Sequence, residues 1–284
     1  MSFQQTTHEQ TDFLQSLRSG QRRGFFHETN AIAALAFRDL LKFLRDPVRM
    51  ISTFVFPLIF IGVLGGSFEA SLGDVVGYSF LTFTFTGVLA QTLFQSSAMG
   101  LISLIEDREN DFSQEIFVSP ISRYSIIFGK VLGESLVSMA QGLGIVAFAA
   151  IIGIDISLRQ ILMLGPALLI VCLFGGAFGV IIMSLLNSQR AANQVFPFVM
   201  LPQFFLAGVF TPITQLPWFL DLLSRLSPMR YAVDLTRAVF YQDRPDASEV
   251  VLAGAGLNLA IIAGLFALFL VAGTYLFVRK EQNR

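Results

Sequence analysis

Six long stretches without a charged side chain constrain this sequence most. Each is at least as long as the roughly 18 apolar residues that mark a bilayer-spanning helix. A soluble domain carries about 25% charged residues, whereas this chain of 284 residues carries 14% and is 54% hydrophobic. The sequence therefore predicts an all-α integral membrane protein with six transmembrane helices. The uncharged stretches are residues 50–68, 75–105, 135–154, 160–189, 191–220 and 250–278.

The transmembrane domain is expected to cover residues 28–284. Residues 1–27 are polar and rich in Gln, Thr and Ser, which predicts a flexible cytoplasmic tail. No apolar core with a small-residue cleavage site precedes residue 50, so we expect no cleaved signal peptide. The expected spans are about 50–68, 77–105, 125–153, 161–186, 193–211 and 251–278.

The placement of Lys and Arg predicts the orientation. With six spans, both ends of the chain lie on the same side of the membrane. Fourteen of the 19 Lys and Arg residues fall on that side and five on the other. Because cytoplasmic loops carry the excess of positive charge, we expect both termini in the cytoplasm and the chain in the plasma (bacterial inner) membrane.

The residues before the first span predict an amphipathic helix along the cytoplasmic leaflet. Apolar residues recur at helical spacing, and basic residues on another face would meet anionic headgroups. Asp46-Pro47 then indicates a helix N-cap with proline at the first helical position, which would begin span one. The apolar residues are Ala33, Phe37, Leu40, Leu41 and Leu44, and the basic residues are Arg38, Lys42, Arg45 and Arg49.

Amide side chains inside the apolar stretches are candidate pathway residues. An unpaired amide in lipid is costly, so each must face protein or a water-filled path. Gln91 and Gln95 lie one helical turn apart and share a face. Helix packing and contact with a cargo both remain open for them. The possible pathway residues are Gln91, Gln95, Asn193, Gln194 and Gln203.

Gly175 and Gly179 form a GxxxG pair in the fourth stretch. Such a pair lets two helices approach closely. The close approach can occur within one subunit or between two subunits, and the sequence leaves both open.

The connection before the last span is broken by prolines, yet it stays apolar up to Leu226. Proline ends helices, so residues 211–249 predict short helices that re-enter the outer leaflet between spans five and six. Arg230, Asp234 and Arg237 then fall on one helical face, where Asp234 can pair with both arginines. We expect a structural ion-pair cluster there, with a substrate site as the alternative.

Motifs for catalysis and metal binding are missing from the sequence. It contains no GxxxxGK[ST] phosphate loop, no GxSxG and no HExxH, and its two histidines, His8 and His27, lie near the N-terminus. Cys172 is the single cysteine and is expected to be packing. The predicted spans hold no acidic or basic group for a proton relay, which ion-coupled carriers usually need. We expect no enzyme activity, catalytic residue or metal site in this chain, and an external source of energy.

The connection between predicted spans two and three, residues 106–120, is where we expect that energy to enter. It is dense in carboxylates and carries two apolar residues one turn apart, and Ser119-Pro120 ends it. A short acidic helix with an apolar ridge can dock into a groove on a soluble partner; a solvated turn is the alternative. The candidate coupling residues are Glu106, Asp107, Arg108, Glu109, Asp111, Phe112 and Ile116.

Two segments resemble a known family. Residues 106–130, with the charged cluster, Ser119-Pro120 and Gly129-Lys130, resemble the coupling-helix region of ABC-2 type permeases. Residues 201–212, LPQFFLAGVFTP, with Leu216-Pro217-Trp218 and residues 227–231, SPMRY, resemble the C-terminal signature of the family's drug-resistance and polysaccharide-export branches. The resemblance covers nearly the whole chain after about residue 28.

The resemblance implies the membrane subunit of an ATP-binding cassette exporter. Its partners would be a separate ABC ATPase, which binds the ATP and Mg²⁺, a second permease in a homo- or heterodimer, and membrane lipids. No nucleic-acid partner is expected. An amphipathic drug, a lipid or a glycolipid-like cargo all remain open. The alternatives are an ATP-independent channel or carrier, or a membrane scaffold for a cytoplasmic partner.

Overall fold

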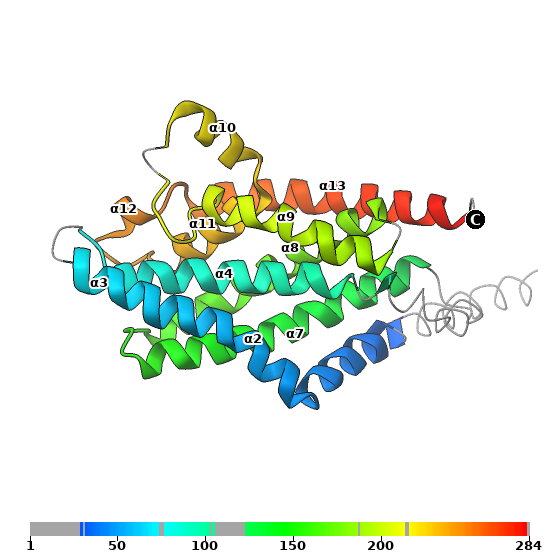
Figure 1. Ribbon diagram of the computed structural model, residues 1–284, viewed down its shortest axis with the longest axis horizontal. Coiled ribbons are helices and arrows are strands. Elements are labelled where there is room, and N and C mark those ends of the chain that lie inside the picture. The colour runs from blue at the N-terminus through cyan, green and yellow to red at the C-terminus, as the bar shows by residue number, and fades with distance from the viewer. Residues whose placement is uncertain are drawn as a thin grey trace, which may run out of the picture.

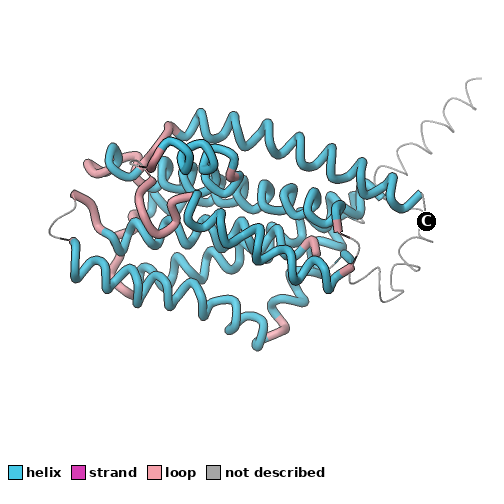
Figure 2. Tube along the Cα trace, turned by 45° about the horizontal axis from the view of Figure 1, so that its top comes forward, coloured by secondary structure: helices cyan, strands magenta, loops and turns pink. Residues whose placement is uncertain are grey.

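The computed structural model describes residues 29–30, 32–73, 77–102, 104–105, 123–186, 188–213 and 216–282. Within these ranges all regular structure is helical, which confirms the all-α prediction for the described part of the chain (Figure 1). The long helices run side by side as a bundle, and many of the loops lie at the end opposite the C-terminus (Figure 2).

The predicted amphipathic helix is present at residues 32–44. Ala36, Asp39 and Phe43 are buried, whereas Phe37 and Leu44 are exposed. The buried side lies on α7 (Arg123–Ile151), whose glycine at position 133 leaves room for Ala36 and Asp39. The exposed apolar side is free to meet lipid, although its contact with a leaflet stays a prediction.

The first long helix begins as its sequence predicts. Asp46 caps α2 (Pro47–Ile59) by accepting a hydrogen bond from the Arg49 backbone N–H at 2.9 Å, and Pro47 occupies the first turn. The helix continues through the π-helical segment η1 (Phe60–Gly65) into α3 (Gly66–Leu72). Because proline lacks an N–H, Pro57 inside α2 removes one helical hydrogen bond shortly before the π segment.

The helix α4 (Phe80–Gly100) forms the centre of the bundle. Most of its side chains are buried, and it packs against α7, α8 (Leu158–Leu185), η1 and α11 (Pro228–Phe240). Ser79 caps its start by accepting from the Thr82 N–H at 3.3 Å. This central position means that polar groups on α4 must find partners inside the protein.

The GxxxG pair brings α8 onto α4 within one chain. A Cβ atom at Gly175 would collide with the carbonyl oxygen of Phe94, and one at Gly179 would collide with the carbonyl oxygen of Ala98. Only glycine permits this distance between two helix backbones. Of the two possibilities that the sequence left open, packing within one subunit therefore accounts for both glycines.

Four helical segments in the described part of the chain are long and apolar enough to cross a membrane. They are Pro47–Ser71, Tyr124–Ile151, Leu158–Leu185 and Ala247–Phe277, and they match predicted spans one, three, four and six. Predicted spans two and five correspond to α4, which carries Thr, Gln and Ser side chains, and to α9 (Gln189–Leu206), which carries Gln, Asn and Arg side chains. The chain is thus a multi-pass membrane protein, and the number six stays a prediction.

The proline-broken connection forms three short helices, α10 (Trp218–Leu226), α11 and α12 (Ala247–Val250), before α13 (Ala255–Gln282). Pro217 precedes α10 and Pro228 begins α11, as their helix-breaking character predicts. The helix α11 is packed against α4, α8 and α13, whereas α10 projects from the bundle (Figure 1). Their entry into a leaflet stays a prediction.

The predicted ion-pair cluster on α11 is wrong. Arg230 pairs with Asp221 of α10 at 3.1 Å. Asp234 instead accepts hydrogen bonds from the backbone N–H groups of residues 252 and 253 and from the Asn258 amide, at 2.7–2.9 Å. The guanidinium of Arg237 lies over the Phe83 ring, 3.7 Å from its centroid. The three side chains share a helix but turn to partners on separate segments.

Candidate functional site

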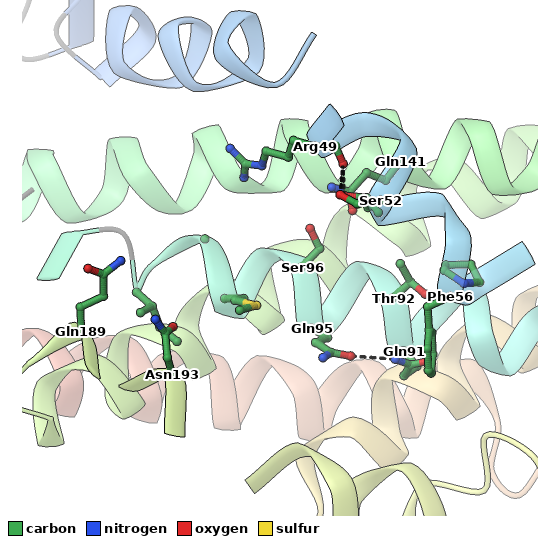
Figure 3. A pocket seen from close by; sticks show the side chains of 15 residues that line it. Arg49, Ser52, Phe56, Gln91, Thr92, Gln95, Ser96, Gln141, Gln189 and Asn193 are labelled. Carbon is green, nitrogen blue, oxygen red and sulfur yellow. Dashed lines mark hydrogen bonds between the residues drawn. The ribbon is translucent and has the colours of Figure 1, made fainter. Parts of the chain in front are cut away.

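A polar cavity of about 570 Å³ lies between α2, α4, α7 and α9 (Figure 3). More than half of the described lining residues carry amides or hydroxyls, and apolar side chains and one guanidinium are among the rest. Its volume falls within the range of about 300–1,000 Å³ that is usual for small-molecule sites. The amide and charged side chains are Gln91, Gln95, Gln141, Gln189, Asn193 and Arg49.

The α4 wall carries the glutamine pair that the sequence singles out. Gln91 Nε2 donates to Gln95 Oε1 at 2.8 Å (Figure 3). The side chain of Gln91 is 1% exposed, and its own Oε1 has no hydrogen-bond partner among the described residues. The hydroxyl of the adjacent Thr92, also at the wall, is likewise buried without a partner in the described part of the chain. This wall therefore contains two buried oxygen atoms with unused hydrogen-bonding capacity.

The opposite wall comes from α7 and α2. Gln141 projects from α7 towards the start of α2, where Arg49 and Ser52 lie (Figure 3). Gln141 is 2% exposed, and its Oε1 has no hydrogen-bond partner within the described ranges. Arg49 is about half exposed. The sequence analysis missed Gln141, although it is the one amide in the uncharged stretch 135–154 and the rule applied to Gln91 would have found it.

The start of α9 closes the cavity on a third side. Ser188 caps this helix by accepting from the Ala191 N–H at 3.2 Å. The cap places Gln189 and Asn193, one turn apart, at the wall. These side chains lie at the end of the cavity that is farther from Gln91 (Figure 3).

The structure brings three of the five predicted pathway residues to this cavity: Gln91, Gln95 and Asn193. Gln194 is exposed and lies outside the lining. Gln203 is buried elsewhere, where its Oε1 accepts from the Met229 N–H at 3.3 Å and from the Ser227 hydroxyl at 3.4 Å. Gln203 thus joins α9 to α11. Contact of any of the five with a cargo stays a prediction.

A buried ion network lies directly beside the cavity. Lys130 Nζ lies 2.9 Å from Asp39 Oδ2 and 2.8 Å from Glu134 Oε1, and all three side chains are less than 10% exposed. The second oxygen of Glu134 lies 4.0 Å from Arg49 of the cavity wall. Gly100, which lines the cavity, packs on Glu134 where any Cβ would collide. The network therefore ties the N-terminal helix, α7 and the cavity together.

This network corrects the prediction that the spans hold no ionisable group able to take part in a proton relay. Lys130 and Glu134 lie inside predicted span three and are buried. Their spacing of four residues signals a pair on one helical face. Their partner Asp39, 91 residues away from Lys130, carries no such signal. A buried charge must be paired to be tolerated, and here each one is.

The predicted coupling residues lie outside the described residues. They are Glu106, Asp107, Arg108, Glu109, Asp111, Phe112 and Ile116. The helices on either side of this segment are α4, which ends at Gly100, and α7, which begins at Arg123. Gly100 lines the cavity, so the chain leaves α4 at the cavity end of the bundle.

A second buried cation lies towards the other end of α4. Arg237 donates to the carbonyl oxygens of Val209 and Phe83, at 3.3 and 3.4 Å. Gly87 leaves the space for this guanidinium, since a Cβ there would lie 2.9 Å from Nη2. The arrangement fastens α11 and the turn after α9 to α4.

The fold and site define a multi-pass helical membrane protein with a polar cavity at one end of its bundle. The family model of the ABC-2 type transporter matches residues 30–241, about three quarters of the chain. The chain therefore belongs to the ABC-2 type transporter family, as its coupling-region and C-terminal motifs predict, and is a transport permease of that type.

Individual relatives agree with this family. A transport permease of Cyanophora paradoxa, ycf38, is 26% identical over 210 residues, which are 72% of each chain. The multidrug ABC transporter permease YbhR of Escherichia coli (strain K12) is 28% identical over 148 residues, 50% of this chain and 39% of its own length. Nodulation protein J of Rhizobium meliloti (strain 1021) is 25% identical over 189 residues, 64% of this chain and 70% of its own.

Proposed function

We propose that this chain is the membrane subunit of an ATP-driven exporter, and that its cargo enters the polar cavity between α2, α4, α7 and α9. One observation carries the proposal. The cavity lies at the end of α4 from which the acidic segment 106–116 departs, so a movement of that segment acts directly on the cavity wall.

The energy would come from a separate ABC ATPase, which holds ATP and Mg²⁺. Its docking on segment 106–116 would use the apolar pair Phe112 and Ile116 for affinity and the carboxylates for specificity. The membership in the ABC-2 family and the name of the Escherichia coli relative as an ABC transporter permease support such a partner.

The ion network would carry motion from that segment to the rest of the cavity. Lys130 and Glu134 lie near the start of α7, the first helix of the described residues after the docking segment. Their contacts with Asp39 and Arg49 join α7 to the N-terminal helix and to α2. A displacement of α7 would therefore move the α7 and α2 walls of the cavity together, which would open and close the cavity as the ATPases approach and separate.

The location and assembly follow from the same account. The cavity end would face the cytoplasm, where ATP is present, with both termini on that side of a bacterial inner membrane. A second permease would complete the pathway. Exposed apolar side chains along α2 and α9, including Ile51, Val55, Phe198 and Phe205, provide a surface for either lipid or that second subunit.

Co-purification with the ATPase tests the proposal. The full chain is expressed together with candidate ABC ATPases from the same genome, and the combined variant Glu106→Ala, Arg108→Ala, Asp111→Ala is compared with wild type. The variant should lose the ATPase. A control with Arg159→Ala and Asp243→Ala breaks an exposed ion pair of 2.8 Å at the opposite end of the bundle and should retain it.

Undiminished ATPase binding by the triple variant, together with hydrolysis that a cargo still stimulates, would contradict the coupling role. If no ATPase is retained by the wild-type chain either, the runner-up is an ATP-independent channel or carrier, or a scaffold for a cytoplasmic protein.

A further inference from the structure

The buried guanidinium of Arg237 lies just beyond one end of the polar cavity. On α4 the described lining residues begin at Gln91, and on α2 they end at Pro57, so the cavity ends at this level. Gly87 is one turn before Gln91 on α4, and a Cβ there would lie 2.9 Å from Arg237 Nη2. A single turn of α4 therefore separates this cation from the cavity.

Arg237 holds the turn that follows α9. Its guanidinium donates to the carbonyl oxygen of Val209 at 3.3 Å and to one carbonyl oxygen of α4 at 3.4 Å. Gly208, with a φ of 71°, redirects the chain just before Val209 in a conformation that other residues rarely adopt. The turn also lies close to α4, because a Cβ at Gly87 would collide with the Val209 carbonyl oxygen. A side chain of α11 thus fixes the turn 207–210 to α4.

The burial of this charge points to a role for its hydrogen bonds. Arg237 is 2% exposed, its Nε has no hydrogen-bond partner among the described residues, and no carboxylate in that part of the chain forms an ion pair with it. The Phe83 ring, whose centroid lies 3.7 Å from the guanidinium carbon, compensates only part of the lost hydration. A methionine would fill similar space without a buried charge. The hold on the turn, rather than the volume of the side chain, therefore accounts for an arginine here.

The turn carries one of four phenylalanine rings that lie at this end of the cavity. Phe210 directly follows Val209, and its ring centroid lies 5.0 Å from that of Phe60. The Phe60 centroid lies 4.1 Å from that of Phe56, which lines the cavity, and the Phe56 centroid lies 6.5 Å from that of Phe204 on α9. The rings therefore lead from the cavity wall to the turn that Arg237 holds.

The helical segment that carries Phe56 and Phe60 is irregular at this point. Pro57 removes one helical hydrogen bond, and Phe60 begins the π-helical segment η1. Short π-helical segments within helices occur frequently at functional sites. The turn 207–210, by contrast, is fastened to the buried helices α4 and α11. The contact between Phe60 and Phe210 thus joins an irregular segment to a fixed one.

We propose that Arg237 is a latch on the cargo pathway: by holding the Val209 carbonyl it keeps Phe210 on Phe60 and closes the cavity at its outer end. The inference rests on the proposed function, because it takes the cavity as the cargo site. Arg237 acts here as a positioning residue, since it reaches the pathway only through the turn. The latch is closed in this structure, and export requires that the Phe60–Phe210 contact opens.

Labelling of a cysteine inside the cavity from each side of the membrane tests the latch. Ser96→Cys places the probe on the cavity wall, in a Cys172→Ala background. A membrane-impermeant maleimide is applied to intact spheroplasts, which expose the outer side, and to inside-out vesicles. With the latch intact, position 96 should be labelled in vesicles and far more slowly in spheroplasts.

Two variants should open the outer end. Arg237→Met should raise the labelling rate in spheroplasts roughly tenfold, because the loss of two hydrogen bonds shifts the equilibrium between closed and open latch by about that factor. Phe60→Ala removes the ring on the other side of the contact and should act in the same direction. An unchanged labelling rate in vesicles, with elution as a single species, shows that a variant is folded. If Arg237→Met fails this criterion, Phe60→Ala decides.

The matched control is Arg244→Met. Arg244 also donates to a carbonyl oxygen, that of Asp155 at 2.6 Å, and its guanidinium lies 4.9 Å from the centroid of the Phe240 ring. It thereby holds the connection between α7 and α8 instead of the turn 207–210. Its replacement should leave the labelling rate in spheroplasts unchanged.

Three outcomes would overturn the latch: labelling of position 96 in spheroplasts as fast as in vesicles before any further substitution, an unchanged rate in spheroplasts for the folded variants, or an equal rise for Arg244→Met. A merely structural role would lower the unfolding midpoint of Arg237→Met without admitting the label from outside. Retention of the ATPase by the wild-type chain shows that the proposed function survives a failure of the latch. Loss of the ATPase from wild type instead rejects the proposed function itself.

Discussion

Replacement of Gln141 and of Gln203 by Met compares a buried glutamine whose Oε1 is unpaired in the described part of the chain with one whose Oε1 joins two helices. Gln141 and Gln203 are both buried amides in long helices, at 2% and 6% exposure. Gln141 Oε1 has no partner in the described part of the chain. Gln203 Oε1 accepts from the Met229 N–H and the Ser227 hydroxyl. The same change should therefore have opposite effects at the two positions.

The magnitudes follow from these contacts. Removing an unpaired buried oxygen relieves a cost of about 1–3 kcal/mol. Part of this gain is lost again, because Gln141→Met also removes the NH₂ group and any hydrogen bond that it donates. Gln141→Met should thus stabilise the protein by about 1 kcal/mol. Gln203→Met leaves the Met229 N–H buried without its acceptor and should destabilise by about 2 kcal/mol. The two variants should differ by about 3 kcal/mol, or roughly 6–12 °C in unfolding midpoint.

Thermal unfolding in lipid nanodiscs measures this difference. Both variants are prepared in parallel with wild type and must elute as single species of the same size. If Gln141→Met lowers the unfolding midpoint below wild type by as much as Gln203→Met does, the reasoning is refuted. It would mean that Gln141 stabilises the empty protein and has no hydrogen-bonding capacity left for a ligand.

Three further perturbations test other parts of the structure. Lys130→Met removes the cation that Asp39 and Glu134 share and should cost about 3 kcal/mol. Adding Glu134→Gln should recover part of the lost unfolding midpoint, and an unchanged midpoint of Lys130→Met would contradict the network. Gly179→Val should place a side chain against the carbonyl oxygen of Ala98 and separate α8 from α4, so a normal yield of folded protein would reject this packing. The two arginines that bind Asp221 lower the pKa of its carboxyl below the ordinary 3.8. Their ion pairs are therefore fully present above about pH 4 and are lost as pH falls through the lowered value. The backbone N–H groups of α10 should therefore lose protection from hydrogen exchange only as pH falls through the lowered pKa of Asp221. In Asp221→Asn this pH dependence of the protection should be absent.

Local patterns in the sequence predicted most of the helices. Charge-free stretches predict helices because a backbone in lipid must satisfy its own hydrogen bonds, and four of them coincide with segments able to span a membrane. Asp46 and the prolines of residues 211–249 predict helix ends because capping and the missing N–H act within a few residues. The Gln91–Gln95 pair was found in the same way, from its spacing on one helix.

Contacts between distant segments could not be predicted in this way. Asp234 shares a helical face with two arginines, yet its carboxylate binds backbone N–H groups near residue 252, whose position depends on how α13 enters the bundle. Asp39 likewise meets Lys130 only because the N-terminal helix lies on α7. Helical spacing identifies side chains that are neighbours on one helix. It does not identify contacts between helices that are distant in the sequence.

The orientation of the cavity end is the central claim, because a coupling segment can receive work only on the side where ATP is present. In a Cys172→Ala background, which removes the single cysteine of the chain, Ser113→Cys marks the coupling segment and Ser248→Cys marks an exposed site at the opposite end. Both are treated with a membrane-impermeant maleimide in intact spheroplasts and in inside-out vesicles. The account predicts labelling at position 248 only in spheroplasts and at position 113 only in vesicles. Labelling of position 113 in intact spheroplasts would place the segment across the membrane from its ATPase and contradict the account.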